Sequence, residues 1–169
     1  MNTKLMFKAT VATFLIPGAV VVLIPYFVFL QSLVIDRFSI SVTAVVAAIF
    51  ASIGLAVLLH CIWGFALHGK GTLAPIDPPR VLVVRGLYKY TRNPMYLAVV
   101  IILLSEALFF NSLPLLVYAL VVLLSFHIFV TIYEEPYLRS HFGKSYEEYV
   151  DAVPRWWISR RPFKSNNTS

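Results

Sequence analysis

Four long runs of apolar residues divide the chain and leave few ways for it to fold. They extend over about residues 9–30, 40–67, 95–110 and 113–133. A helix needs about 20 apolar residues to cross the hydrocarbon core of a bilayer, a length that these runs reach or approach. A soluble chain of 169 residues has too little interior to bury them, since hydrophobic residues make up 59% of the sequence. The runs predict an all-α fold, a polytopic transmembrane helical bundle of about four spans.

The third and fourth runs are separated only by Asn111 and Ser112. Pro114 suits the first turn of the fourth helix, because the N–H that proline lacks would be unpaired there anyway. These features predict a tight helical hairpin at the C-terminal end of the bundle. The first run exceeds the roughly 7–15 apolar residues of a signal peptide, so we interpret it as a retained span.

The basic residues follow the same division of the chain. Of the 14 Lys and Arg residues, all but Arg37 precede the first run, lie between the second and third, or follow the fourth. With four spans these three segments share one side, which the positive-inside rule makes the cytoplasm. We therefore expect a multi-pass protein of the cell membrane with both termini in the cytoplasm. The basic excess indicates topology and contact with anionic lipids, not nucleic-acid binding.

The polar residues indicate one membrane domain over residues 1–169. Its expected parts are the first two spans (1–67), a cytosolic connecting segment (68–94), the hairpin (95–133) and a cytosolic C-terminal segment (134–169). An active site is expected at the inner face, where the two cytosolic segments meet the ends of the last three spans. Cys61 is the only cysteine, and the four histidines have no metal-ligand spacing, so no metal site is predicted. The oligomeric state stays open.

The connecting segment ends in a possible anion site. Pro94 fits the first position of the third helix, with Asn93 as its cap. The N-terminus of a helix offers free N–H groups and a positive dipole end, and Arg92 adds a cation beside it. The alternative is that Arg92, like Arg85 and Lys89, only anchors the spans among lipid headgroups.

Two carboxylates, Glu134 and Glu135, follow the fourth run. They are expected at a helix C-terminus, where the dipole disfavours negative charge, so Arg92, a cationic ligand or water must compensate them. Farther along, Tyr146 and Tyr149 are three residues apart and should share one face of a short helix. The stretch Pro154-Arg155-Trp156-Trp157 is typical of an interfacial aromatic anchor.

Two polar residues within the apolar runs leave alternatives open. Glu106 either reaches the outer headgroups or is a functional acid inside the membrane. His127 lies seven residues before Glu134, on a similar helix face, and is either an interhelical hydrogen-bond partner or a catalytic base.

Taken together, these motifs resemble a known family. The stretch Gly86–Tyr96, a pair of spans, Glu134-Glu135 and then Phe142-Gly143-x-x-Tyr146-x-x-Tyr149 are similar to the isoprenylcysteine carboxyl methyltransferases and the related phospholipid methyltransferases, over roughly residues 70–157. The resemblance implies S-adenosylmethionine bound at the cytosolic ends of the last helices. It also implies a lipophilic substrate or lipid-linked acceptor that enters from the bilayer.

The resemblance also implies roles for individual residues. Arg92 and Glu134 are the implied catalytic residues, and the implied cofactor-binding residues are Tyr88, Arg92, Asn93, Pro94, Tyr96, Glu134, Glu135 and Tyr146. One departure concerns the acceptor: the isoprenylcysteine enzymes usually have His where this chain has Asn93, and Asn cannot exchange a proton near neutral pH. The acceptor, whether an isoprenylcysteine-like carboxylate, a thiol or a phospholipid amine, stays open.

Two other classes of protein compete with a methyltransferase. Membrane reductases of the steroid 5α-reductase kind use NADPH and have a similar Pro-x-Tyr element. They typically carry an acidic residue shortly after that tyrosine, where this chain has Leu97-Ala98-Val99. A non-catalytic helical assembly protein would leave the carboxylates at the inner face unexplained. The sequence therefore favours a methyltransferase.

Overall fold

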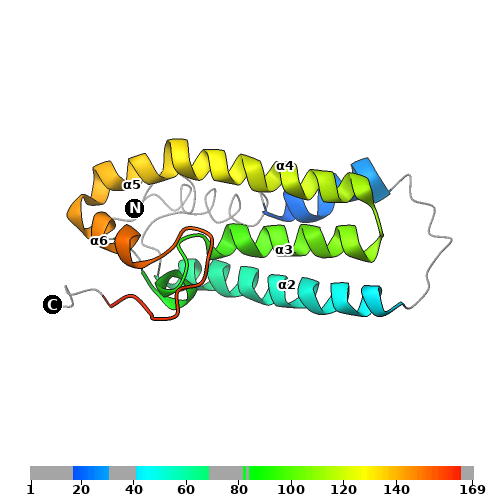
Figure 1. Cartoon of the computed structure of the whole chain (residues 1–169), viewed down its shortest axis with the longest axis horizontal. Helices are drawn as coiled ribbons and strands as arrows, with labels where there is room; N and C mark the ends of the chain where they lie inside the picture. The colour runs from blue at the N-terminus through cyan, green and yellow to red at the C-terminus, as the bar shows by residue number, and fades with distance from the viewer. Residues whose placement is uncertain (1–16, 31–40, 69–81, 83, 165–169) are drawn as a thin grey trace.

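The computed structural model of the chain describes residues 17–30, 41–68, 82 and 84–164. No strand occurs among them, so the predicted all-α class is confirmed for this part of the chain. Figure 1 shows an elongated bundle in which α2, α3 and α4 run lengthwise. The elements, in order, are η1 (Ala19–Leu23), η2 (Pro25–Leu30), α2 (Val42–His68), η3 (Gly86–Lys89), α3 (Pro94–Phe109), α4 (Leu113–Phe129), η4 (Val130–Glu134), α5 (Glu135–Phe142) and α6 (Lys144–Ala152).

Helices α2 and α3 lie side by side (Figure 1) and approach closely at Gly54. A Cβ atom on Gly54 would lie 2.8 Å from Cγ1 of Ile102 and 3.2 Å from the backbone oxygen of Ala98. Around this contact a small apolar core joins α2, α3 and α4, with buried side chains that include Leu58, Val99, Leu103 and Ala119. The absence of a side chain at Gly54 thus lets α3 pack closely against α2.

Most large side chains of α2 and α4 point away from this core. Ile49, Phe50, Leu120, Val121 and Leu124 are all about half exposed. Two helical stretches, Val42–Gly64 and Leu113–Phe142, are long and apolar enough to cross a membrane, each with a mean hydropathy of 2.6. A helix surface that is apolar on its outward side needs lipid as its solvent, which supports a membrane protein. The larger number of four spans stays a prediction.

The structure agrees with several predicted boundaries. Helix α3 begins at Pro94, which occupies the first turn as expected. Helix α4 begins after Ser112, whose side chain accepts a hydrogen bond from the Leu115 N–H at 3.4 Å. Of the first run, residues 17–30 are helical, and the Tyr118 hydroxyl of α4 donates to the Val20 carbonyl at 3.0 Å. Residues 9–16 of that run lie outside the described part.

The predicted end of the fourth helix at Tyr133 is wrong. Helix α4 continues through the π-helical turn η4 into α5 and stops only at Gly143, where φ is +52°. Pro136, in the first turn of α5, has no N–H and its ring crowds the carbonyl four residues earlier. The wider π turn directly before it accommodates this defect. Glu134 and Glu135 therefore lie inside a continuous helix, and the expected unfavourable dipole at a helix C-terminus does not apply.

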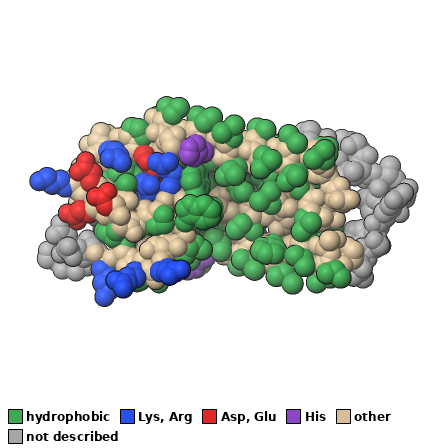
Figure 2. Space-filling model, viewed as in Figure 1, with side chains coloured by type: hydrophobic (Ala, Val, Ile, Leu, Met, Phe, Trp, Pro, Cys, Tyr) green, Lys and Arg blue, Asp and Glu red, His purple; other side chains and the backbone are tan. Residues whose placement is uncertain are grey.

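Charged side chains gather at one end of the bundle, around α5 and α6 (Figure 2). The opposite end contains the connection between α3 and α4 (Figure 1). Toward that second end Glu106 is half-buried, and its Oε2 atom has no hydrogen-bond partner among the described residues. Five of the basic residues on which the predicted topology rests lie outside the described part, namely Lys4, Lys8, Arg37, Lys70 and Arg80.

Candidate active site

Residues 153–163, which we call the strap, cross the polar end of the bundle and pair with residues 89–93. Three backbone hydrogen bonds hold the strap, donated by the N–H groups of Arg92, Ser159 and Phe163 to the carbonyls of Pro154, Tyr90 and Lys89 at 3.0, 2.7 and 3.0 Å. The sequence predicted only an interfacial anchor here. Trp157 and Ile158 are indeed more than three-quarters exposed, but the strap also forms one wall of the candidate site.

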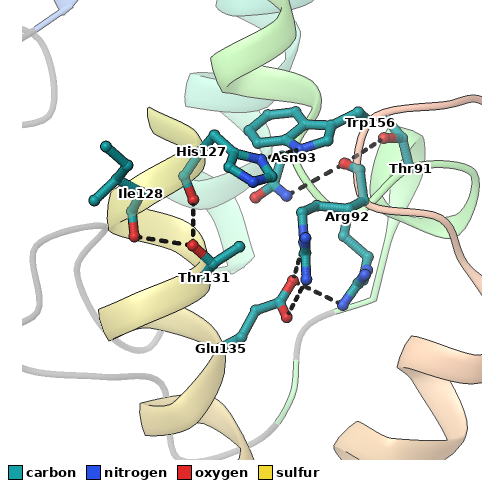
Figure 3. Close-up of polar contacts among 9 residues, drawn as sticks. Thr91, Arg92, Asn93, His127, Ile128, Thr131, Glu135 and Trp156 are labelled. Atoms are coloured by element: carbon teal, nitrogen blue, oxygen red, sulfur yellow. Dashed lines mark hydrogen bonds and ion pairs between the residues drawn. The ribbon is translucent and has the colours of Figure 1, made fainter. Parts of the chain in front are cut away.

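Glu135 forms ion pairs with two arginines, Arg155 from the strap and Arg92 from the connecting segment. Figure 3 shows Arg92 beside Glu135. The Arg155 Nε donates to Glu135 Oε1 at 2.6 Å, and Nη2 donates to Oε2 at 2.8 Å. This hydrogen bonding raises the pKa of Arg155. The Arg92 Nη1 lies 3.0 Å from Oε1 of the same carboxylate. Two cations thus share one anion, which leaves the cluster with one excess positive charge.

Arg92 is the more buried of the two arginines. Its side chain is only 10% exposed, against 29% for Arg155. The Nε and Nη1 atoms of Arg92 are buried and have no hydrogen-bond partner among the described residues, since the contact with Glu135 lacks hydrogen-bond geometry. A buried guanidinium with unpaired donors is costly, so this position favours an anionic ligand.

Asn93 precedes α3 as predicted, but its side chain does not cap the helix. The amide Nδ2 instead donates to the Arg155 carbonyl at 3.2 Å, and the Thr91 hydroxyl donates to the same oxygen at 3.4 Å. The predicted side-chain cap is therefore wrong, because the strap carbonyl takes the amide. Asn93 is buried and ties the start of α3 to the strap.

Glu134 has a different partner from Glu135. The Tyr96 hydroxyl, on the first turn of α3, donates to Glu134 Oε2 at 3.0 Å. The Tyr96 ring packs on Phe126 of α4 with centroids 4.6 Å apart, which holds the hydroxyl in place. Among the described residues, no salt bridge reaches the half-buried Glu134 carboxylate. Glu134 is thus a carboxylate without an ion-pair partner in the described part of the chain, and we call it the negative pole of the site.

The predicted tyrosine face of α6 is confirmed. Tyr146 and Tyr149 are buried with ring centroids 6.1 Å apart. The Tyr149 hydroxyl donates to the Tyr88 carbonyl at 2.7 Å, so α6 is fastened to the connecting segment. Burial first, and nearby acidic groups second, raise the pKa of both Tyr88 and Tyr146. These phenols stay neutral at physiological pH and offer aromatic faces without charge.

His127 is a hydrogen-bond partner, but its partner lies on the strap and not on another helix. The Trp156 Nε1–H donates to His127 Nδ1 at 3.1 Å (Figure 3). An accepting Nδ1 carries no proton, so a neutral His127 has its proton on Nε2. The second interpretation of His127, as a catalytic base, stays a prediction.

Comparison with known protein families gives a match over most of this site. A model of the phospholipid methyltransferase family matches residues 42–145. The chain belongs to this family. No curated protein and no solved structure matches the chain. The match begins in α2, well before the motifs that carried the resemblance, and it ends just before Tyr146.

Membership supports methyl transfer as the activity and a membrane as the location. It favours a methyltransferase over the two competing interpretations, an NADPH-dependent reductase and a non-catalytic assembly protein. The matched part contains most of the implied site residues, including Arg92, Asn93, Glu134 and Glu135. The strap with Arg155 lies beyond it.

The structure brings the implied site residues together in two groups. Arg92 and Glu135 belong to the ion cluster, whereas Tyr96 and Glu134 form a second pair. Sequence reasoning missed Arg155, which it assigned to the headgroups. The only signal was that the paired carboxylates needed compensation, and nothing local in the sequence connects residues 135 and 155.

Proposed function

We propose that this membrane methyltransferase uses S-adenosylmethionine and methylates a lipophilic acceptor that enters from the bilayer. The observation that carries the proposal is the buried Arg92 guanidinium, whose Nε and Nη1 have no hydrogen-bond partner among the described residues. Such a group matches the carboxylate of an amino-acid ligand through charge-assisted hydrogen bonds.

The residues present fit this cofactor at both of its charged ends. Arg92, at the N-terminus of α3, would hold the carboxylate. Glu134 would face the positive groups, with the neutral rings of Tyr88 and Tyr146 as further aromatic contacts. The cofactor, when bound, supplies a methyl group that a sulfonium makes electrophilic. Asn93 binds the strap carbonyl of Arg155 and Pro94 begins α3, so these two residues fix the position of Arg92 relative to the strap.

The chain itself has to align the acceptor and exclude water, because in-line methyl transfer depends mainly on these two effects. A carboxylate or thiolate acceptor needs no base. An amine must first lose a proton, and Glu134, hydrogen-bonded to Tyr96, is our candidate for accepting it. Both the description of the family and the Asn93 departure favour a phospholipid amine over an isoprenylcysteine carboxylate.

For the topology we propose four spans with α3 and α4 as a hairpin, in the cell membrane, with both termini in the cytoplasm. The support is the gathering of charged side chains at one end of the bundle (Figure 2). The connection Phe110–Ser112 at the other end has no charged residue. The candidate site then lies at the cytosolic interface, where a soluble cofactor and a lipid acceptor meet.

Calorimetric titration of the detergent-purified protein with S-adenosylmethionine and, separately, with NADPH tests the cofactor. Binding of the methyl donor without binding of NADPH is the expected result. A response to NADPH alone would overturn the proposal. The acceptor is tested by incubating the protein with radiolabelled methyl donor and vesicles that contain phosphatidylethanolamine, with phosphatidylglycerol vesicles as the control. Label should enter the amine lipid only. Equal labelling of both lipids, or labelling of neither, would refute the amine assignment.

A further inference from the structure

We infer that Arg155 is a positioning residue that occupies Glu135 and so keeps Arg92 available for the anionic end of the ligand. The inference rests on the proposed function, and it extends the site beyond residues 42–145, the part that matches the family.

The hydrogen-bond geometry separates the roles of the two arginines. Arg155 engages both carboxylate oxygens of Glu135, at 2.6 and 2.8 Å, in the side-on arrangement that binds a carboxylate most firmly. Arg92 only approaches Oε1, at 3.0 Å, without a hydrogen bond. Glu135 is therefore satisfied by the strap, and the buried donors of Arg92 are not consumed by it.

The alternative is that Arg155 merely clamps the strap in place. The strap has its own attachments, because Arg92, Ser159 and Phe163 hold it through backbone hydrogen bonds. The Arg155 backbone carbonyl also accepts from Asn93 and Thr91, and this contact does not depend on the side chain. Removal of the Arg155 guanidinium should therefore leave the strap folded and change mainly the partner of Glu135.

Without the Arg155 guanidinium, Arg92 is the arginine left in ion-pair contact with Glu135 among the described residues, and Arg139 acts on this carboxylate only from farther away. A buried carboxylate next to a buried guanidinium gains by forming full hydrogen bonds with it. Arg92 would then be neutralised by its own protein, and a ligand carboxylate would have to compete with Glu135. If Glu135 is also made neutral, the competitor disappears and Arg92 is free again.

A positioning role of Arg155 predicts that a second substitution reverses the loss of cofactor affinity, whereas a role in holding the strap predicts no such recovery. In Arg155→Ala, the dissociation constant for S-adenosylmethionine should rise about tenfold or more, the effect of one lost charge-assisted contact. Adding Glu135→Gln to that variant should restore affinity to within about threefold of the wild type, a difference below 1 kcal/mol. Steady-state kinetics should show a higher KM for the methyl donor with a smaller change in kcat. Arg160→Ala, which removes an exposed strap cation, is the matched control and should bind like the wild type.

The double variant decides the outcome. If it binds as weakly as Arg155→Ala, or if Arg155→Ala binds like the wild type, the inference is overturned while the proposed function stands. No binding by the wild type overturns both. Should Arg155→Ala fail to fold, Arg155→Gln, which also lacks the cation but fills more of the same space, replaces it with and without Glu135→Gln, and the same two outcomes decide.

Discussion

Replacement of Arg92 by alanine should weaken ligand binding strongly and change the stability of the protein little. Arg92 offers two buried donors, Nε and Nη1, that make no hydrogen bond with any described residue, although Nη1 lies in ion-pair contact with Glu135. A hydrogen bond to a charged group contributes about 1.5–3 kcal/mol. Since neighbouring contacts are not additive, we take about 3 kcal/mol for the pair, which corresponds to an increase of roughly a hundredfold in the dissociation constant for S-adenosylmethionine.

The ligand-free protein should lose little stability in the same variant. Glu135 keeps both hydrogen bonds from Arg155, so no carboxylate is left without a partner. The variant also removes two buried donors, Nε and Nη1, that have no hydrogen-bond partner among the described residues, which is itself favourable. We therefore expect the free energy of unfolding to change by no more than about 1 kcal/mol.

Calorimetric titration measures the binding, and thermal unfolding of the detergent-solubilised protein without ligand measures the stability. Lys89→Ala is the control, because Lys89 is an exposed cation in the same segment whose described contact is made by its backbone carbonyl. It should bind the cofactor like the wild type. The assignment of Arg92 to the cofactor carboxylate fails if Arg92→Ala binds normally. The assignment also fails if the variant binds less cofactor only because less of the protein is folded.

Three further predictions concern other parts of the molecule. Gly54→Ala should unfold more easily than Gly64→Ala by about 1–3 kcal/mol, since both gain helix propensity but only the first forces a Cβ against α3, whereas Gly64 has open space. Thermal unfolding compares the two, and equal stability would contradict the close packing of α2 on α3. Tyr149→Phe should lose about 1–2 kcal/mol of stability in the same assay, because the partly buried Tyr88 carbonyl loses its 2.7 Å hydrogen bond. Glu134→Gln should weaken S-adenosylmethionine about tenfold more than S-adenosylhomocysteine, which has no sulfonium charge. An equal effect on both ligands in calorimetric titration would place Glu134 away from the sulfonium.

The helical boundaries follow from local features that a sequence displays directly. The ends of α2 and α3 lie within about two residues of the predicted limits, because apolar length and the proline at the start of α3 are local signals. Gly86 has a positive φ of +56°, a conformation that glycine adopts without a steric penalty. Such features require no knowledge of what the segment contacts.

The site depends on contacts that the sequence does not display. Pro136 and two carboxylates normally indicate a helix end, yet the π turn η4 carries the helix past them. The partner of Glu135 is 20 residues away on the strap, and the amide of Asn93 is drawn to the same segment. Tertiary pairing decided both outcomes, and no periodicity or spacing in the chain encodes it.

The charges of the site also explain why the strap belongs to it. Within the part that matches the family, Arg92 and Glu135 would neutralise each other, and Glu134 would remain as a lone negative pole. Such a site suits a cation but offers nothing to a carboxylate. Arg155 engages Glu135 and thereby restores a positive pole at Arg92, while Glu134 keeps its own partner, Tyr96. A ligand with a carboxylate and a sulfonium needs both poles at once, so the cofactor proposal and the role of Arg155 depend on the same arrangement of charges.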